Sequence, residues 1–187
     1  MHKLVMVAFA ASLAMPVMAA DMKALVAESR GTIKDFVSSL KAALVVAVES
    51  GGPLHAIGVC NMDAPAIVAS QSVAFRGRVG RTSLRRRNPA NAPDSWEHDV
   101  LNAFEVRLAA GEGISGIDHA EVVRENGRTV FRYMKAIPTG GVCLTCHGDD
   151  LDPEIAAAID ARYPDDQARG FAMGDIRGAF TVRRHLD

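Results

Sequence analysis

The dipeptide Asn126-Gly127 constrains the folds open to this chain more than any other short stretch. Both residue types tolerate positive φ angles, so the pair favours a tight turn between two antiparallel strands. Candidate strands flank it at 119–125 and 129–137, and alternating side chains predict a last strand over 178–184. An antiparallel sheet is therefore expected in the second half of the chain.

The first half of the chain is predicted to be helical. Apolar residues recur along 22–50 at the spacing of one helix face, which predicts a long amphipathic helix. Gly51-Gly52-Pro53 ends it, because glycine suits the position after the last turn and proline stops a helix. A short helix is expected over 54–60, and Asp63 and Pro65 have the residue types of a further helix start. The apolar face of the long helix consists of Ile33, Phe36, Val37, Leu40 and Leu44.

A strand and another helix are predicted between these two regions. Residues 73–80 have the composition of a strand, and a polar loop rich in Arg, Asn and Pro follows over 81–93. Asp94 and Glu97 have the spacing of a capping box, which marks the start of a helix. Helices first, then a hairpin and a late strand, predict an α+β fold, an antiparallel sheet with flanking helices and a long N-terminal helix. The apolar face after Asp94 consists of Trp96, Val100, Leu101, Phe104 and Leu108.

The first twenty residues have the pattern of a secretory signal peptide. A positively charged start precedes an apolar run over 4–13, and Ala19-Ala20 offers small residues for cleavage. A membrane anchor is the alternative, but this run is too short to span a bilayer and Pro16 soon follows it. No later stretch reaches about 18 uninterrupted apolar residues. Residues 21–187 are therefore predicted to form a single exported, periplasmic domain with no membrane contact.

Composition limits the classes of function. The chain has 187 residues, 49% of them hydrophobic and 23% charged, which is enough to bury a core without disulfides or metals. The formal net charge of -1 argues against a protein that binds nucleic acid through a strong basic excess. Three cysteines are too few, and odd in number, for a disulfide scaffold.

The sequence Cys143-Leu144-Thr145-Cys146-His147 is the haem attachment pattern Cys-x-x-Cys-His. Two thiols separated by two residues lie along one turn and can add to the two vinyl groups of a haem. The adjacent His147 then points its imidazole at the iron as the proximal ligand. One covalent haem c is therefore the predicted cofactor, and export fits it, because covalent attachment takes place outside the cytoplasm.

Other sites can use two nearby cysteines. A redox Cys-x-x-Cys motif is expected after a strand in a βαβ unit, which this chain does not show. A zinc site needs a second Cys/His pair nearby, and none is present. A structural disulfide is the remaining alternative.

The third cysteine, Cys60, is left over if Cys143 and Cys146 hold a haem. An odd thiol in an oxidising compartment invites unwanted disulfides unless it is buried or bound. A small buried hydrophobe is the simpler interpretation of Cys60, and composition does not select the sixth ligand of the iron. The other candidates for that ligand are His55, His98, His119, Met62, Met134 and Met173.

Four stretches stand out as a set: 56–60 with 64–67, 79–83 running into 87–93, 143–148, and 174–179. Together and in this order they resemble a family of haem c-binding, PAS-like sensor domains. The Arg-Asn-Pro-Ala-Asn sequence over 87–91 and the haem motif are the most specific parts of the resemblance. It implies a PAS-like fold and a cysteine in the first stretch, here Cys60, as the distal haem ligand opposite His147.

The residues Arg81, Arg85, Arg86 and Arg87 form the one concentrated positive patch of the sequence. Such a run is often a solvated face, and it also suits docking to an acidic redox partner. Arg81 and Arg87 lie in the stretches that carry the resemblance, and we expect them to pair with haem propionates, since arginine binds carboxylates through two hydrogen bonds. Tyr133 precedes the haem motif and is a candidate for lining the pocket, with a plain strand aromatic as the alternative.

These features predict a periplasmic c-type haem protein that senses redox state or a diatomic gas and passes that state to a protein partner. A small soluble electron-transfer cytochrome is the alternative. A peroxidase-type enzyme is a third, which needs distal acid–base groups, and His55 is the obvious helper near Cys60. The long first helix suits pairing across a homodimer and an intramolecular core equally well.

Overall fold

The computed structural model describes the backbone of residues 15–187 and the side chains of residues 21–187 except 60 and 61. The predicted signal peptide, 1–20, falls on residues that lie wholly or partly outside this description. The side chain of the candidate ligand Cys60 lies outside it as well.

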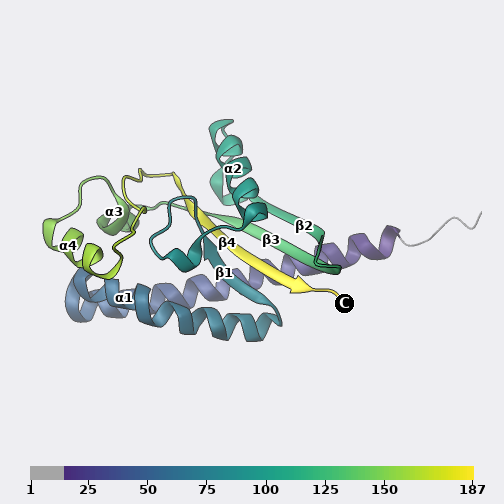
Figure 1. Cartoon of the computed structure of the whole chain (residues 1–187), viewed down its shortest axis with the longest axis horizontal. Coiled ribbons are helices and arrows are strands. Elements are labelled where there is room, and N and C mark those ends of the chain that lie inside the picture. The colour runs from purple at the N-terminus through teal and green to yellow at the C-terminus, as the bar shows by residue number, and fades with distance from the viewer. Residues whose placement is uncertain (1–14) are drawn as a thin grey trace, which may run out of the picture.

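The helix α1 (Met15–Phe75) is broken in the middle, and its two halves fold back on each other (Figure 1). Gly51 and Gly52 have non-helical backbone angles, with φ 70° and ψ -170° at Gly52, so the predicted helix end at this position is confirmed. The prediction of two helices after the break is wrong, because 53–75 is one helix with Asp63 and Pro65 inside it. Its residue Ala64 is 2% exposed, so packing offsets the backbone hydrogen bond that Pro65 removes.

Four strands form one antiparallel sheet in the order β1-β4-β3-β2. Asn126 and Gly127, with φ of 50° and 81°, make the predicted turn between β2 and β3. The last predicted strand is also present, longer at both ends than expected. The strands are β1 (Arg78–Thr82), β2 (Asp118–Glu125), β3 (Arg128–Pro138) and β4 (Ile176–His185).

The strand predicted over 73–80 begins later than expected. Residues up to Phe75 belong to α1, Arg76 turns the chain with a φ of 55°, and β1 starts at Arg78. Phe75 is 1% exposed and the guanidinium of Arg184 lies over its ring, 3.8 Å from the centroid. A helical position buries this ring in the core, which the local sequence does not reveal.

Helices cover both faces of the sheet, which confirms the α+β fold (Figure 1). On one face α1 buries Ile33 and Phe36 against β3 and β4. On the other face lies α2 (Ser95–Ala109), whose predicted capping box is confirmed by bonds of 2.9 and 3.1 Å between Asp94 and Glu97. The core beneath α2 contains Val100, Leu101, Phe104, Ile117, Met134, Ala136, Ile176 and Ala179.

Two further helices, α3 (Gly141–His147) and α4 (Pro153–Arg162), lie at the end of the molecule where α1 turns back (Figure 1). A small apolar cluster joins α1 to α4 through Ile57, Ile159 and Tyr163. Short 3-10 helices occupy Pro89–Asn91 and Ile114–Gly116. The end of the sheet that faces α3 is therefore enclosed by segments far apart in the sequence.

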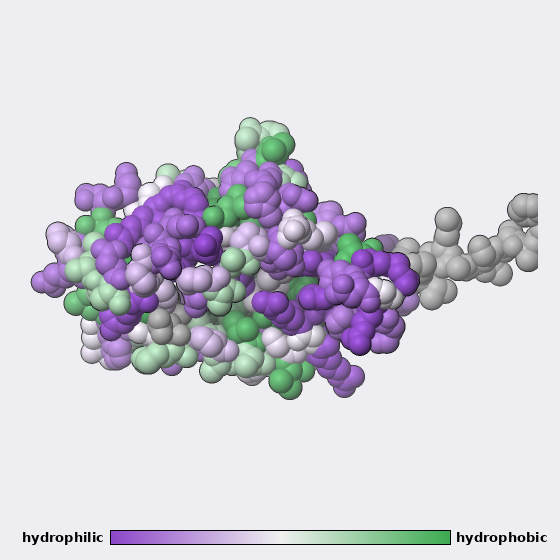
Figure 2. Space-filling view, in the orientation of Figure 1, coloured by the Kyte–Doolittle hydropathy of each residue, from purple (hydrophilic) through white to green (hydrophobic). Residues whose placement is uncertain are grey.

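One helical segment of the described chain, Asp21–Val59, is long and apolar enough to cross a membrane by length and composition alone. Within that segment Ile33 and Phe36 are buried against the sheet, while Val46 is 64% exposed. Figure 2 shows hydrophobic side chains along the lower edge, where α1 lies, within a largely hydrophilic surface. The expected absence of membrane contact stays a prediction.

Candidate functional site

The Cys-x-x-Cys-His sequence forms the short helix α3. Cys143 and Cys146 are three positions apart, close to one helical turn, so both thiols lie on one side of α3. Both residues are half-buried, and the Gly140 N–H donates to the sulfur of Cys143 at 3.4 Å. A Cβ atom at Gly148 would lie 2.7 Å from the carbonyl oxygen of Leu144, so only glycine allows this close helix end.

The imidazole of His147 is half-buried and has a fixed orientation. Its Nδ1 lies 2.7 Å from the carbonyl oxygen of Ala168, which only accepts, so Nδ1 carries the proton and Nε2 keeps its lone pair. The ring of Phe171 meets the imidazole edge-on, with centroids 6.3 Å apart. Burial, followed by the positive charges of Arg177 and Arg87, lowers the pKa of His147 to about 3. A neutral imidazole with an oriented Nε2 lone pair is the form that binds a metal.

The side chain of Arg87 ties α3 to the segment that holds His147. It donates to the carbonyl oxygen of Cys146 at 2.6 Å and to that of Ala168 at 3.3 Å. It also bonds both carboxylate oxygens of Asp166, at 3.0 and 3.2 Å. Burial alone would raise the pKa of Asp166, but the hydrogen bonds from Arg87 and from the Ala168 N–H hold it below its ordinary value. We call this set of bonds around Arg87 and Asp166 the Arg87 clamp.

A cavity of about 280 Å³ opens beside Cys143, Cys146 and His147. Both halves of α1 contribute to its walls, as do the ends of β1 and β3, the start of β4 and the loop after β1. The wall is apolar in large part, and none of the described carboxylates lines it. The apolar lining includes Leu40, Leu44, Ala56, Ile57, Ile137 and Phe180.

Four arginine residues line the same cavity, Arg81, Arg86, Arg87 and Arg177. The guanidinium of Arg86 bonds Gln167 on the exposed surface. Arg177 donates to Ser83 Oγ at 3.3 Å, and its Nε is buried with no hydrogen-bond partner among the described atoms. Burial, followed by the charges of Arg87 and Arg81, lowers the pKa of Arg177 to about 10. Because a half-buried cation among like charges is unfavourable by itself, the arrangement suits a ligand with anionic groups.

Comparison with known proteins shows which family the chain belongs to. The model of one protein family matches residues 12–184. The chain belongs to the Tll0287-like family. The crystal structure of the cyanobacterial heme-protein Tll0287 matches this Tll0287-like chain with a TM-score of 0.62 and 21% identity, over 86% of this chain and 96% of that one. The similarity shows a shared fold. No curated protein matches the chain.

The residues of this Tll0287-like site fit a covalently bound haem. The two thiols on α3 and the Nε2 lone pair of His147 are the donor set that haem c uses. Apolar walls suit a porphyrin, and the arginines at the cavity suit its propionates. No group of three or more His, Cys, Asp and Glu side chains elsewhere in the described residues could hold a metal ion, so the zinc alternative lacks ligands there.

Position 60 lies on the half of α1 that borders the cavity. Ala56 and Ile57 line the cavity. Residue 60 lies four positions after Ala56 and three after Ile57 in the same helix. Residues with this spacing share one helix face. The backbone thus places Cys60 on the face that borders the cavity.

The six other candidates for the sixth ligand do not line the cavity. Met134 is fully buried beneath α2, whereas Met62 and Met173 are 71% and 65% exposed. His55 lies 3.1 Å from the hydroxyl of Ser50 at the α1 break. The remaining two, His98 and His119, lie next to Asp99 and Glu121 on α2 and β2.

The structure does not bring Tyr133 to the cavity. Its side chain is fully buried in the core under α1, where its hydroxyl donates to Asp118 at 2.7 Å. Ile137, four residues further along β3, is the residue on the same face that reaches the cavity. Since a strand rises about 3.3 Å per residue, Tyr133 lies about 13 Å short of that end. Tyr133 therefore does not line the pocket as predicted. It is a core aromatic of β3, which was the alternative interpretation.

The two predicted propionate partners, Arg81 and Arg87, both line the cavity, but their guanidinium groups make different contacts. Arg81 lies with its guanidinium carbon 5.7 Å from the ring centroid of Phe36. Arg87 forms the clamp, so its guanidinium is already engaged by Asp166 and two carbonyl groups. The sequence assigned no role to Arg177, although this half-buried cation lies in the stretch 174–179. Only the return of β4 beside β1 shows that it faces the cavity.

Proposed function

We propose that this protein binds one haem c and serves as a periplasmic, PAS-like sensor of redox state or of a diatomic gas. Cys143 and Cys146 would form the thioether bonds, and His147 and Cys60 would bind the iron. The observation that carries the proposal is the oriented Nε2 of His147 beside two thiols of one helical turn at an apolar cavity. The matched crystal structure is that of a heme-protein, which supports the proposal.

Haem supplies a redox-active iron in such a site, and the chain supplies orientation and charge. The carbonyl oxygen of Ala168 fixes the tautomer and the ring plane of His147. Arg177 and Arg81 are placed to pair with propionates, which would satisfy the buried Nε of Arg177. The Arg87 clamp holds the attachment helix against the segment 166–168.

The proposed distal ligand Cys60 is the residue that makes the site responsive. A thiolate is an anionic donor and favours ferric over ferrous iron, so Cys60 is the ligand expected to leave on reduction. Its departure would open one coordination position to a small ligand and release the 53–75 half of α1, which the Gly51–Gly52 break joins to the rest of the helix.

The experiment compares the purified haem-loaded protein with Cys60→Ala and with Met62→Ala, an exposed sulfur donor two positions away. We expect pyridine haemochrome bands of haem c in all three. Cys60→Ala should alter the ferric absorption and EPR spectra and raise the midpoint potential, whereas Met62→Ala should change neither.

Three outcomes separate the alternatives. Colourless protein from a host competent in cytochrome maturation would overturn haem binding. Unchanged spectra in Cys60→Ala would remove Cys60 as the ligand. Unchanged ligation on reduction, with fast electron exchange, would favour an electron carrier over a sensor. The peroxidase alternative has less support, because no described carboxylate and no described histidine besides His147 lines the cavity.

Export is the part of the proposal that rests on residues 1–20. Cleavage after Ala19 or Ala20 gives a mature chain that begins with Ala20 or Asp21. Intact mass and N-terminal sequencing of protein from the periplasmic fraction should find one of these two ends. A chain that retains Met1 in the cytoplasmic fraction would refute export.

A further inference from the structure

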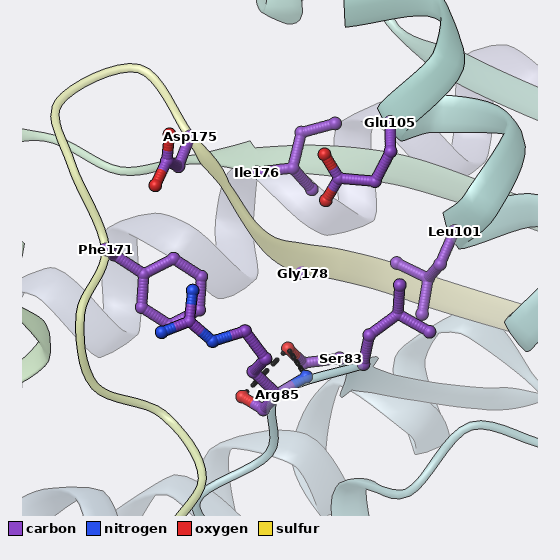
Figure 3. A pocket seen from close by; sticks show the side chains of 9 residues that line it. Ser83, Arg85, Leu101, Glu105, Phe171, Asp175, Ile176 and Gly178 are labelled. Carbon is purple, nitrogen blue, oxygen red and sulfur yellow. Dashed lines mark hydrogen bonds between the residues drawn. The ribbon is translucent and has the colours of Figure 1, made fainter.

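A second cavity, of about 250 Å³, lies on the α2 side of the sheet. It is bounded by α2, by the start of β4 and by the loop that follows β1 (Figure 3). It is close in size to the cavity beside α3, and both lie just below the roughly 300–1,000 Å³ of pockets that hold drug-sized ligands. It shares Ser83 and Gly178 with the site beside α3 but contains none of the proposed haem ligands.

Two carboxylates face this cavity. Figure 3 shows Glu105 extending from α2 and Asp175 just before β4, on either side of the Ile176 side chain. Asp175 is held by the N–H of Ala172, which donates to one of its oxygens at 2.7 Å. Glu105 has no hydrogen bond or ion pair with the described residues. Partial burial, followed by the negative charge of Asp175, raises the pKa of Glu105, whereas the positive charge of Arg85 lowers it. A cationic group between the two carboxylates would relieve this repulsion.

One guanidinium faces the same space. Arg85 lies flat on the ring of Phe171, with its guanidinium carbon 4.0 Å from the centroid, and Figure 3 shows it below Asp175. Its backbone is fixed by Ser83, whose Oγ accepts from the Arg85 N–H and donates to the Arg85 carbonyl, both at 3.1 Å. The guanidinium itself has no hydrogen bond with the described residues. It is thus a positioned donor for a carboxylate.

We propose that this cavity binds a small α-amino acid with an aliphatic side chain. The ammonium group lies between Glu105 and Asp175, the carboxylate pairs with Arg85, and the side chain packs on the apolar wall of Leu84, Leu101 and Ile176. A simple cation would leave Arg85 without a partner and close to a like charge. A simple anion would face two carboxylates. A molecule with both charges satisfies both halves of the site.

The proposal is tested by calorimetric titration of the purified haem-loaded protein with L-valine at pH 7. Two probes each lack one charge: 2-methylpropylamine has no carboxylate, and 3-methylbutanoate has no ammonium group. We expect L-valine to bind and each single-charge probe to bind at least about tenfold more weakly, as the loss of one charge-assisted hydrogen-bonded group predicts.

Variants test which side chains bind the two charged groups of L-valine. Glu105→Gln and Arg85→Gln should each weaken L-valine binding by at least about tenfold. Asp99→Asn is the matched control, because it removes the same charge from α2 at a side chain that is 85% exposed and outside the cavity. Glu105 and Arg85 are exposed residues, so both variants should keep the melting temperature of the parent protein.

Three results would overturn the proposal: no heat of binding with L-valine, equal binding of either single-charge probe, or unchanged binding in Glu105→Gln. Haem content is read separately from the absorption spectrum of the same sample. Failure of the haem proposal therefore stays distinguishable from failure of this one.

Discussion

Replacing Arg87 with alanine tests how the attachment helix α3 is held. The side chains of Arg87 and Asp166 are 11% and 3% exposed, so the substitution leaves a buried carboxylate without its main partner. Removing one partner of a buried ion pair costs about 3–5 kcal/mol. Asp166 keeps a bond to Arg169 at 2.9 Å, so we expect the lower end, a loss of about 3 kcal/mol in the free energy of unfolding.

The neighbouring Arg86 is the matched control. Its guanidinium bonds Gln167 at 3.2 Å on the exposed surface, so Arg86→Ala should cost no more than about 0.5 kcal/mol. Urea unfolding of the haem-loaded protein, followed by circular dichroism, measures both. With an m-value of about 2 kcal/mol/M, the midpoint should fall by about 1.5 M for Arg87→Ala and by about 0.25 M or less for Arg86→Ala. Equal shifts in the two variants would refute the clamp.

Three other substitutions test the rest of the fold. Burial raises the pKa of Asp118, but hydrogen bonds from Tyr133 and Arg30 bring it below its ordinary value. Asp118 therefore stabilises the folded chain above about pH 4, an effect lost as the pH falls through the lower folded pKa. Urea midpoints at pH 7 and pH 3 should differ less in Asp118→Asn, and an unchanged difference would contradict this. Gly178 has φ 150° and a Cβ there would lie 2.4 Å from a β1 backbone oxygen. Gly178→Ala should lower the free energy of unfolding by about 2–3 kcal/mol, measured in urea. No change would show that the β1 and β4 backbones move apart to admit the methyl group. Phe36 is fully buried, so Phe36→Ala should cost about 3–5 kcal/mol; a loss under about 1 kcal/mol would place it outside the core.

Features set by a few neighbouring residues could be predicted from the sequence. The Asn126-Gly127 turn, the Asp94–Glu97 capping box and the break at Gly51-Gly52 all occur where expected. In each case the backbone preference or hydrogen bond acts within about four residues, so no distant contact is needed to decide it.

Features set by distant contacts were predicted less well. The helix start at Asp63 was wrong and the strand predicted over 73–80 begins only at Arg78, because the helix 53–75 is held by packing that buries Ala64 and Phe75. Proline in a helix is unfavourable locally, and the sequence does not show the sheet that compensates for it.

The candidate site divides in the same way. The motif places Cys143, Cys146 and His147 on one short helix by spacing alone. Tyr133 lies on the same face of β3 as Ile137, but the docking position of α3 decides which end of β3 meets the cavity. The burial of Arg177 depends on β4 pairing with β1, so its importance appears only in the folded chain.

The packing of Cys146 bears on how the protein is assembled. Its side chain contacts the cluster of Ile57, Ile159 and Tyr163, which joins the first helix to the fourth. Because Cys146 also lines the cavity, a thioether at this sulfur would link a bound haem directly to the contact between these two helices. Contacts between residues so far apart in the sequence form slowly. A haem attached at this sulfur would therefore lie at one of the last contacts of the fold to form.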